Sequence, residues 1–348
     1  MAKAASRRSK PTRSLNLGLQ GGGAHGAFTW GVLDRLLEEP DLKIEAISGT
    51  SAGAMNGAMV VAGYEDGGAE GARALLDTFW GRISSFAALS PIRRMPWSGS
   101  STGNPWNLDY SLSYLFLDAL TRAFSPYQLN PLNMNPLRDV LEEVLEIGQL
   151  RRCEKIKLFV NATNVRTGKI KVFATDEVSI DALLASACLP FMFRTVEIDG
   201  EPYWDGGYMG NPAIFPLIYR TDCADVMLVQ INPLNRDEIP TTAADIWNPV
   251  NEISFNSTLM REMRAIAFVT RLIEQERLDT SAYKSLRMHA IADEAEMTGL
   301  GVASKMNAEM DFLLHLKGVG RAAADRWLAE HGDAIGQRSS LDIAATFL

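Results

Sequence analysis

The chain has 348 residues, 47% of them hydrophobic and 22% charged, which is the composition of a globular protein long enough to bury a large core. Its formal net charge of −8 argues against a nucleic acid as the main partner. The three cysteines are too few for a disulfide scaffold and lack the spacing of a zinc site, and they predict a cytoplasmic protein. No apolar run approaches the ~18 residues of a spanning helix, which excludes a transmembrane protein.

The N-terminus differs from the rest of the chain in charge. Residues 1–13 are predicted to form a basic, disordered tail. A weak electrostatic contact of this tail with anionic lipid is the alternative. The apolar stretch that follows is too short and too rich in glycine for a signal peptide. The cations that precede the first acidic residue are Lys3, Arg7, Arg8, Lys10 and Arg13.

Two strand–helix pairs come next. Strands are predicted over Leu15–Gln20 and Lys43–Ser48, and helices over Gly26–Glu39 and Ala52–Gly63. This order implies parallel strands joined by right-handed crossovers. The sequence therefore predicts an α/β fold with a mainly parallel central sheet.

Residues 81–136 interrupt this alternation. The segment 90–110 is dense in Pro, Gly, Ser and Trp and predicts a loop, and an apolar stretch follows at 111–124. The insert is either a lid or lipid-facing rim over an active site, or an ordinary apolar subdomain. The aromatic residues that raise this question are Trp80, Trp97, Trp106, Phe116 and Phe124.

The remaining elements alternate less regularly. We expect residues 14–235 to form the catalytic domain and 236–348 a mainly helical part packed on it. Helices are predicted over Leu137–Leu150, Ser179–Ala187, Ile253–Leu278 and, with a break near Gly318–Gly320, Ser304–Glu330; strands are predicted over Ile156–Thr163, Lys169–Ala174, Ala224–Ile231 and Leu286–Ile291.

A pattern typical of serine hydrolases follows the second predicted strand. Gly49, Ser51 and Gly53 form G-x-S-x-G, in which the serine lies on a strained strand-to-helix turn and the glycines allow close neighbours. The helix N-terminus favours the negative charge that develops during attack. Ser51 is therefore a candidate nucleophile, and a helix-capping role is the alternative.

Gly99, Ser101 and Gly103 fit the same pattern. This second occurrence lies between two prolines, with no predicted strand before it and no helix after it. We therefore interpret Ser101 as an ordinary loop serine.

The glycine-rich loop "GGGAHG" allows two functions. Gly21, Gly23 and Gly26 fit the G-x-G-x-x-G of dinucleotide sites, but such a site needs an acidic residue about 20 positions later, at the end of the second strand. That strand ends in the serine turn instead. We therefore favour an oxyanion hole formed by the amides of Gly22 and Gly23, joined by that of Ala52. Nucleotide binding is the alternative.

A serine nucleophile needs a base, and histidine is the first candidate. His289 lies in a predicted strand and is the best candidate for a triad. His25 belongs to the glycine loop and is more suited to support it or to start the helix. His315 and His331 lie on late helices and are expected to be surface or packing residues.

The other candidate base is Asp205. Gly206 and Gly207 follow it and allow a tight turn with close approach to another backbone. An ordinary Asp-Gly turn is the alternative.

Four motifs, "GGGAHG", "GTSAG", "ASACLPFMF" and "DGG", occur in this order within Leu15–Ile231. The chain resembles the patatin-like phospholipase family, whose A-S-x-x-x-P-x-x-F segment falls here on Ala185, Ser186, Pro190 and Phe193. The resemblance implies a three-layer α/β/α fold, a Ser–Asp dyad of Ser51 and Asp205, and no metal or cofactor. It also implies a lipid ester as substrate.

A dyad is chemically demanding, because an aspartate with a pKa near 4 is a poor base at neutral pH. A site poor in water would raise its basicity. The headgroup, acyl position and acyl length stay open, as do thioesters. A peripheral contact with a membrane or lipid-droplet surface is compatible with this function. A nucleotide-binding protein and an inactive lipid-binding scaffold are the other functions considered.

Overall fold

The computed structural model describes residues 13–88, 104–108, 111–236, 239–241, 243–279 and 282–348. Ser101, Trp97 and the tail up to residue 12 lie outside these ranges. The strands are β1 (Arg13–Leu19), β2 (Leu42–Gly49), β3 (Lys157–Asn164), β4 (Ile170–Ala174), β5 (Val196–Ile198), β6 (Glu201–Asp205), β7 (Asp225–Val229) and β8 (Arg287–Ile291).

Helices fill most of the remaining described chain. The α-helices are α1 (Gly26–Leu36), α2 (Ala52–Ala87), α3 (Leu112–Ala123), α4 (Pro126–Leu129), α5 (Pro136–Val144), α6 (Ile147–Arg152), α7 (Ile180–Ser186), α8 (Phe215–Tyr219), α9 (Ala243–Glu274), α10 (Glu294–Thr298), α11 (Met310–His331) and α12 (Ile343–Phe347). The 3₁₀ helices are η1 (Gly23–His25), η3 (Gly206–Tyr208), η4 (Val302–Met306) and η5 (Gly332–Ala334). Within the residues that the structure describes, no helix combines the length and apolar character needed to cross a bilayer.

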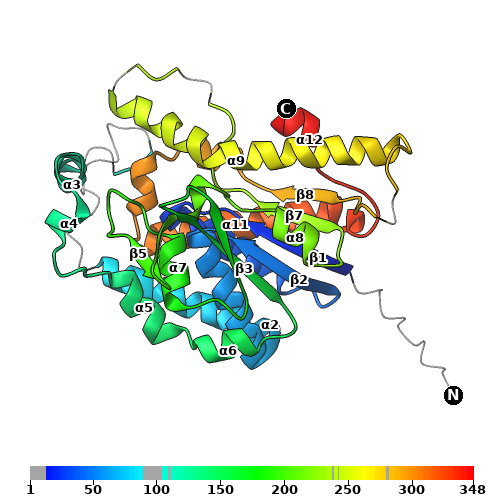
Figure 1. Ribbon diagram of the computed structural model, residues 1–348, viewed down its shortest axis with the longest axis horizontal. Coiled ribbons are helices and arrows are strands. Elements are labelled where there is room, and N and C mark those ends of the chain that lie inside the picture. The colour runs from blue at the N-terminus through cyan, green and yellow to red at the C-terminus, as the bar shows by residue number, and fades with distance from the viewer. Residues whose placement is uncertain (1–12, 89–103, 109–110, 237–238, 242, 280–281) are drawn as a thin grey trace.

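One mainly parallel sheet lies at the centre of the molecule (Figure 1). Its strand order is β5-β6-β3-β2-β1-β7-β8, and β4 pairs with β3. The strands from β3 to β8 in this order are parallel, whereas β4, β5 and β6 pair in antiparallel fashion. The predicted α/β class with a mainly parallel sheet is confirmed.

Helices cover both faces of the sheet, because its central strands are apolar on both sides. In β7, Met227 and Val229 belong to the core shared with α1, α2 and α11. The alternate side chains Val226 and Leu228 pack in a second core with Leu259 of α9. In Figure 1, α9 and α12 lie above the sheet, and α2, α5 and α6 lie below it. This is the three-layer α/β/α arrangement that the resemblance implied.

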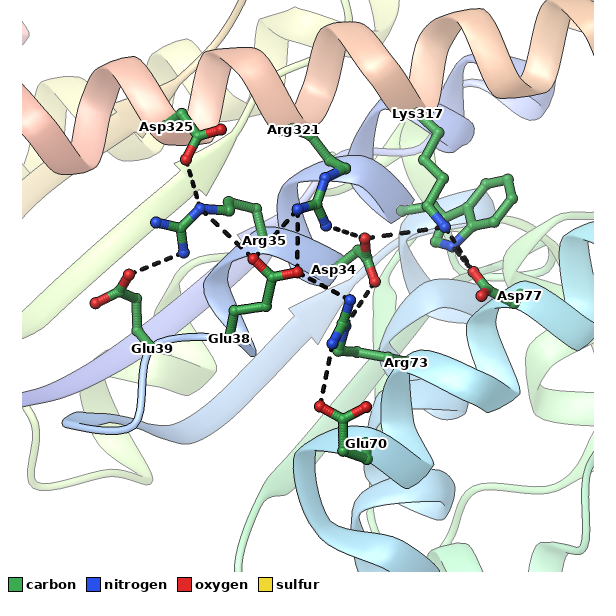
Figure 2. A network of polar contacts seen from close by, with 11 residues as sticks. Asp34, Arg35, Glu38, Glu39, Glu70, Arg73, Asp77, Lys317, Arg321 and Asp325 are labelled. Carbon is green, nitrogen blue, oxygen red and sulfur yellow. Dashed lines mark hydrogen bonds and ion pairs between the residues drawn. The ribbon is translucent and has the colours of Figure 1, made fainter.

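A polar network joins α1, α2 and α11 (Figure 2). Asp34 of α1 accepts hydrogen bonds from Arg73 of α2, at 2.8 Å, and from Arg321 of α11. Burial alone would raise the pKa of Asp34, but the hydrogen bond from Arg73 and the charge of Lys317 lower it below its ordinary value. The network therefore ties α11 to the first two α-helices of the chain.

Two predicted helix boundaries are wrong. The expected break near Gly318–Gly320 does not occur, and α11 runs through it. A Cβ at Gly320 would lie 2.1 Å from the carbonyl oxygen of Phe28, so this glycine allows α1 and α11 to pack closely rather than ending a helix. The single helix predicted over Leu137–Leu150 is instead two helices, α5 and α6, because Leu145 and Glu146 have extended backbones.

Other differences concern elements that the sequence pattern did not show. The strands β5 and β6 were not predicted, α2 continues to Ala87 across non-helical Gly67 and Gly68, and α9 begins at Ala243 rather than Ile253. Arg13, expected in the disordered tail, is the first residue of β1, and its Nη2 donates a hydrogen bond to Asp41 at 3.1 Å.

Candidate active site

Ser51 lies on a strained turn between β2 and α2. It has φ 53° and ψ −122°, and such backbone conformations cost about 1–3 kcal/mol in a residue other than glycine. The backbone N–H of Ser51 donates a hydrogen bond of 2.9 Å to the buried hydroxyl of Ser186. Ser186, which belongs to the "ASACLP" segment, thus holds the serine turn from the end of α7.

The neighbours of Ser51 leave no room for larger residues. A Cβ at Gly53 would lie 2.2 Å from the carbonyl oxygen of Leu19, at the end of β1. A Cβ at Gly49 would lie 2.6 Å from the carbonyl oxygen of Gly53. Both glycines of the G-x-S-x-G pattern are therefore required by close backbone packing.

The register of the sheet brings Asp205 to this turn. Gly49, the last residue of β2, pairs with Val160 of β3. Two residues further along β3, Ala162 pairs with Lys171 of β4 on one edge and with Asp205 of β6 on the other. Because β6 takes the edge of β3 that β2 leaves, Asp205 lies just beyond the end of β2, where Ser51 follows.

Asp205 is buried, and its carboxyl group is influenced by the hydroxyl of the candidate nucleophile. Its side chain, in a residue only 1% exposed, accepts a hydrogen bond of 2.7 Å from the backbone N–H of Gly207. Burial raises the pKa of Asp205 to about 7, although the hydrogen bond from Gly207, the hydroxyl of Ser51 and the charge of Lys305 lower it. At neutral pH this carboxyl group can therefore both accept and release a proton.

Buried amide side chains connect the serine turn to the aspartate loop. Asn161 of β3 donates from Nδ2 to the carbonyl oxygens of Gly206 and Gly210, at 3.1 and 2.8 Å. The hydroxyl of Thr50 lies 2.7 Å from Asn161 Oδ1. Asn161 was not predicted as a site residue, and the available signal was an asparagine between the apolar residues Val160 and Ala162 of a predicted strand, where an unsatisfied amide would be costly.

The glycine loop packs directly against the serine turn. A Cβ at Gly21 would lie 2.8 Å from the Cβ of Ser51, and one at Gly26 would lie 2.7 Å from the Cβ of Ala52. Gly23 has φ 58°, a left-handed conformation that favours glycine. The structure therefore brings together the three motifs that contain Gly21, Ser51 and Asp205.

Not every amide of this loop can bind a substrate oxygen. The N–H of Gly21 donates a hydrogen bond of 2.6 Å to Asn211 Oδ1, so it is already used. Among the described residues, the amides of Gly22, Gly23 and Ala52 have no hydrogen-bond acceptor. These are the amides that the sequence analysis assigned to an oxyanion hole.

Pro190 and its neighbours connect α7 to the aspartate. Pro190 lies in a turn after α7, and the carbonyl oxygen of Cys188 accepts a hydrogen bond of 2.8 Å from the N–H of Asp205. The "ASACLP" segment therefore supports both members of the candidate dyad, through Ser186 and through Cys188.

His25 supports the glycine loop rather than contacting Asp205. Its Nε2 lies 2.7 Å from the hydroxyl of Ser304, and the ring is buried. Burial, with the charges of Lys305 and Arg236, lowers the pKa of His25 well below its ordinary value. The ring is therefore neutral at pH 7.

His289 is not placed to act on Ser51. It lies on β8, three strands from β2 in the sheet. Its Nδ1 is 2.9 Å from the hydroxyl of Ser340, and its Nε2 is 3.1 Å from Asp225 Oδ1. The predicted alternative of a triad with His289 is therefore wrong, because this ring joins the C-terminal segment to β7.

This interaction predicts an effect on stability. Burial would raise the pKa of Asp225, but hydrogen bonds with His289, Arg287 and the Gly336 N–H lower it to about 2. A depressed pKa stabilises the fold above the unfolded value near 4, and this contribution is lost as pH falls towards 2. Asp225→Asn should lower the melting temperature at pH 7 by several degrees, and the difference from wild type should shrink below about pH 4. The exposed neighbour Asp222→Asn should change little at either pH; an equal effect of both substitutions would contradict this account.

His315 and His331 lie away from the dyad, on α11. His315 Nε2 is 2.8 Å from Glu296 Oε1, and its ring stacks on Trp106. The ring of His331 lies 6.1 Å from that of Trp327. Within the described residues, no group of three His, Cys, Asp or Glu side chains could hold a metal ion.

Comparison with known proteins gives a family and several solved structures. The sequence model of the patatin-like phospholipase family matches residues 17–218. No curated protein matches the chain at the sequence level. The chain is 16% identical to VipD from Legionella pneumophila, with a TM-score of 0.37, covering 88% of this chain and 68% of that one.

Two further solved structures contain ExoU. The type III effector protein ExoU is 15% identical, with a TM-score of 0.29, over 88% of this chain and 54% of that one. In the structure of SpcU with ExoU from Pseudomonas aeruginosa, the identity is 16% and the TM-score 0.28, over 96% and 66%. The chain thus spans from about half to two thirds of the length of these structures.

Proposed function

Because the chain belongs to the patatin-like phospholipase family, we propose that it hydrolyses carboxylic ester bonds of lipids, with Ser51 as nucleophile and Asp205 as base. The observation that carries this proposal is the approach of the Ser51 hydroxyl to the buried carboxyl group of Asp205, beside a loop whose amides at Gly22 and Gly23 have no acceptor among the described residues. Nothing in this arrangement requires a metal or cofactor.

The first half of the cycle forms an acyl-enzyme. Asp205 takes the proton of the Ser51 hydroxyl while Oγ attacks the carbonyl carbon of the ester. The carbonyl electron pair moves to oxygen, and the amides of Gly22, Gly23 and Ala52 donate hydrogen bonds to the resulting anion. The anion then collapses, the ester C–O bond breaks, and Asp205 returns its proton to the departing alcohol.

The second half repeats these steps with water. Asp205 deprotonates a water molecule, which attacks the acyl carbon on Ser51. Collapse of the second tetrahedral anion releases the fatty acid, and the proton returns to Ser51 Oγ. Both halves need a base whose pKa lies near the working pH, and burial gives Asp205 such a value, about 7.

We propose that residues 112–134 of the insert, together with Phe191, form a lipid-facing rim. The helix α3 buries none of its residues. Tyr127 of α4 donates a hydrogen bond of 3.0 Å to Thr195, in the segment that follows Phe191. Exposed apolar patches of this kind mark contact surfaces. The exposed apolar side chains of this rim are Leu112, Leu115, Phe116, Phe124, Leu132, Met134 and Phe191.

Substitutions in this rim should weaken binding to lipid surfaces without changing the chemical step. The double substitution Leu112→Ser with Phe116→Ser should reduce co-sedimentation with phospholipid vesicles and hydrolysis of vesicle lipid by roughly tenfold, because about 25 cal/mol is lost for each Å² of apolar surface. Hydrolysis of a water-soluble p-nitrophenyl ester should not change. Tyr219→Ser removes an exposed aromatic residue on α8 and serves as control. Equal losses on soluble and vesicle substrates would contradict the rim.

Release of free fatty acid tests the proposed function. Purified protein should release fatty acid from at least one of a phospholipid, a lysophospholipid, a neutral ester and a thioester. Its melting temperature should not shift with nucleotides. Stabilisation by a nucleotide without ester hydrolysis would support the nucleotide-binding alternative, and vesicle binding without fatty acid release would support an inactive scaffold.

The compartment is proposed on separate grounds. The three cysteines, Cys153, Cys188 and Cys223, are free and buried. Free thiols persist in reducing compartments. We therefore propose that the enzyme acts in the cytoplasm, with peripheral contact to a lipid surface.

A further inference from the structure

Lys305 lies against the glycine loop, although it falls outside the matched residues 17–218 and no motif contains it. It belongs to η4, which packs on η1. A Cβ at Gly23 would lie 2.4 Å from the carbonyl oxygen of Lys305 and 3.4 Å from its Cβ. The backbone of Lys305 therefore fixes the position of Gly23, one of the proposed oxyanion donors.

The side chain of Lys305 reaches the same loop through an amide. Its Nζ donates a hydrogen bond of 2.8 Å to Asn232 Oδ1. Asn232 Nδ2 donates in turn to the carbonyl oxygen of Gly21 at 2.9 Å. Asn232 Oδ1 would lie 3.7 Å from a Cβ at Gly22, so the ammonium group lies beside the loop as well.

The charge of Lys305 acts mainly on the proposed dyad, because the other charged groups around it are paired or neutral. Glu252 pairs with Arg236 at 2.7 Å, so these two charges largely cancel. His25 is neutral at pH 7. Asp205 is the remaining acid that acts on Lys305 in the part of the chain that the structure describes. Burial lowers the pKa of Lys305 to about 8, while Glu252 and Asp205 raise it and Arg236 lowers it.

The other groups that face Asp205 are not cations. Cys188 and Tyr208 lie near it, and burial raises the pKa of each to about 12, so both are neutral at pH 7. Lys305 is therefore the positive charge that acts on Asp205 among the described residues.

We infer that Lys305 is a positioning residue of the proposed acyl-transfer site: through Asn232 it holds the glycine loop, and its charge stabilises the Asp205 carboxylate and the oxyanion. The inference rests on the proposed function. It adds to the four motifs a residue from the C-terminal part of the chain. It also identifies a cation that opposes the effect of burial on the pKa of Asp205.

The pH dependence of kcat for a soluble ester tests this role. The wild type should give a bell-shaped profile, rising as Asp205 loses its proton near pH 7 and falling as Lys305 loses its own near pH 8. In Lys305→Met, kcat should fall by roughly 10- to 100-fold, and the acid limb should move up by about 1 pH unit because the nearby cation is gone. The alkaline limb should disappear.

Two variants separate charge from structure. Lys305→Arg should keep the acid limb in the wild-type position and lose the alkaline decline, because arginine stays charged. Lys284 is another partly buried lysine with a pKa lowered by burial, and it bonds the carbonyl oxygen of Thr221 rather than the glycine loop. Lys284→Met should leave both limbs unchanged.

These experiments distinguish failure of the Lys305 inference from failure of the proposed function. Hydrolysis by the wild type with an acid limb that does not move in Lys305→Met would overturn this inference alone. An alkaline decline that persists in Lys305→Arg would also overturn this inference alone. The Lys305→Arg profile can still be measured if Lys305→Met does not fold. Absence of ester hydrolysis by the wild type would overturn the proposed function, and the inference with it.

Discussion

Ser51→Ala is expected to lower kcat for ester hydrolysis by about 10⁵-fold or more, because the variant lacks the oxygen that forms the acyl-enzyme. KM should change little, since the glycine loop and the rim are intact. Steady-state hydrolysis of a p-nitrophenyl ester measures both constants. The fold should survive, because the Ser51 N–H, which bonds Ser186, is retained.

Ser101→Ala is the matched control for this substitution. Ser101 carries the same G-x-S-x-G pattern but lies outside the described residues. Its replacement should leave kcat within about twofold, as is usual for a residue that takes no part in the chemistry. Retention of more than a tenth of the activity in Ser51→Ala, or loss of activity in Ser101→Ala, would contradict the assignment of the nucleophile.

Asp205→Asn should lower kcat by about 10⁴-fold or more, because loss of one residue of a Ser–His–Asp triad costs about 10⁴- to 10⁶-fold. An amide at this position can still bond the Gly207 N–H through its oxygen, but it cannot take a proton. The matched control is Asp176→Asn, an exposed aspartate, which should keep full activity. A loss of less than about tenfold in Asp205→Asn would mean that another group is the base.

The same substitution should raise stability at alkaline pH. The pKa of Asp205 is raised from 3.8 to about 7 in the folded protein. A raised pKa stabilises the fold below the unfolded value and loses this contribution as pH rises through about 7. The melting temperature of Asp205→Asn relative to wild type should therefore increase from pH 4 to pH 8. A constant difference across this range would contradict the burial of a charge at Asp205.

Much of the fold could be predicted because its signals are local. The first two strands end in glycine-rich turns, and each is followed by a helix, so pattern alone places Ser51 at a strand-to-helix turn. The strand β6 had no such signal, because its five residues include Glu201, Pro202 and Asp205. Its position depends on β3 extending past the end of β2, which is a property of the sheet rather than of either segment.

The parts of the candidate site whose backbone belongs to a local motif could be predicted. Contacts between side chains that lie far apart in the sequence could not. Asn161 and Asn211 each stabilise a turn more than 40 residues away. Lys305 comes from a short 3₁₀ helix that contacts Gly23. Nothing in the local pattern of these segments shows their partners. His289, in contrast, was a candidate base because it is a histidine in a predicted strand, but its partners are Asp225 and Ser340.

Labelling with a fluorophosphonate, followed by mass spectrometry of the peptides, tests the central claim most directly. We predict one adduct, on the peptide that contains Ser51, absent in Ser51→Ala and formed much more slowly in Asp205→Asn. An adduct on another serine would contradict the Ser51–Asp205 dyad. A Ser51→Ala variant that is still fully labelled and still hydrolyses esters would contradict it as well.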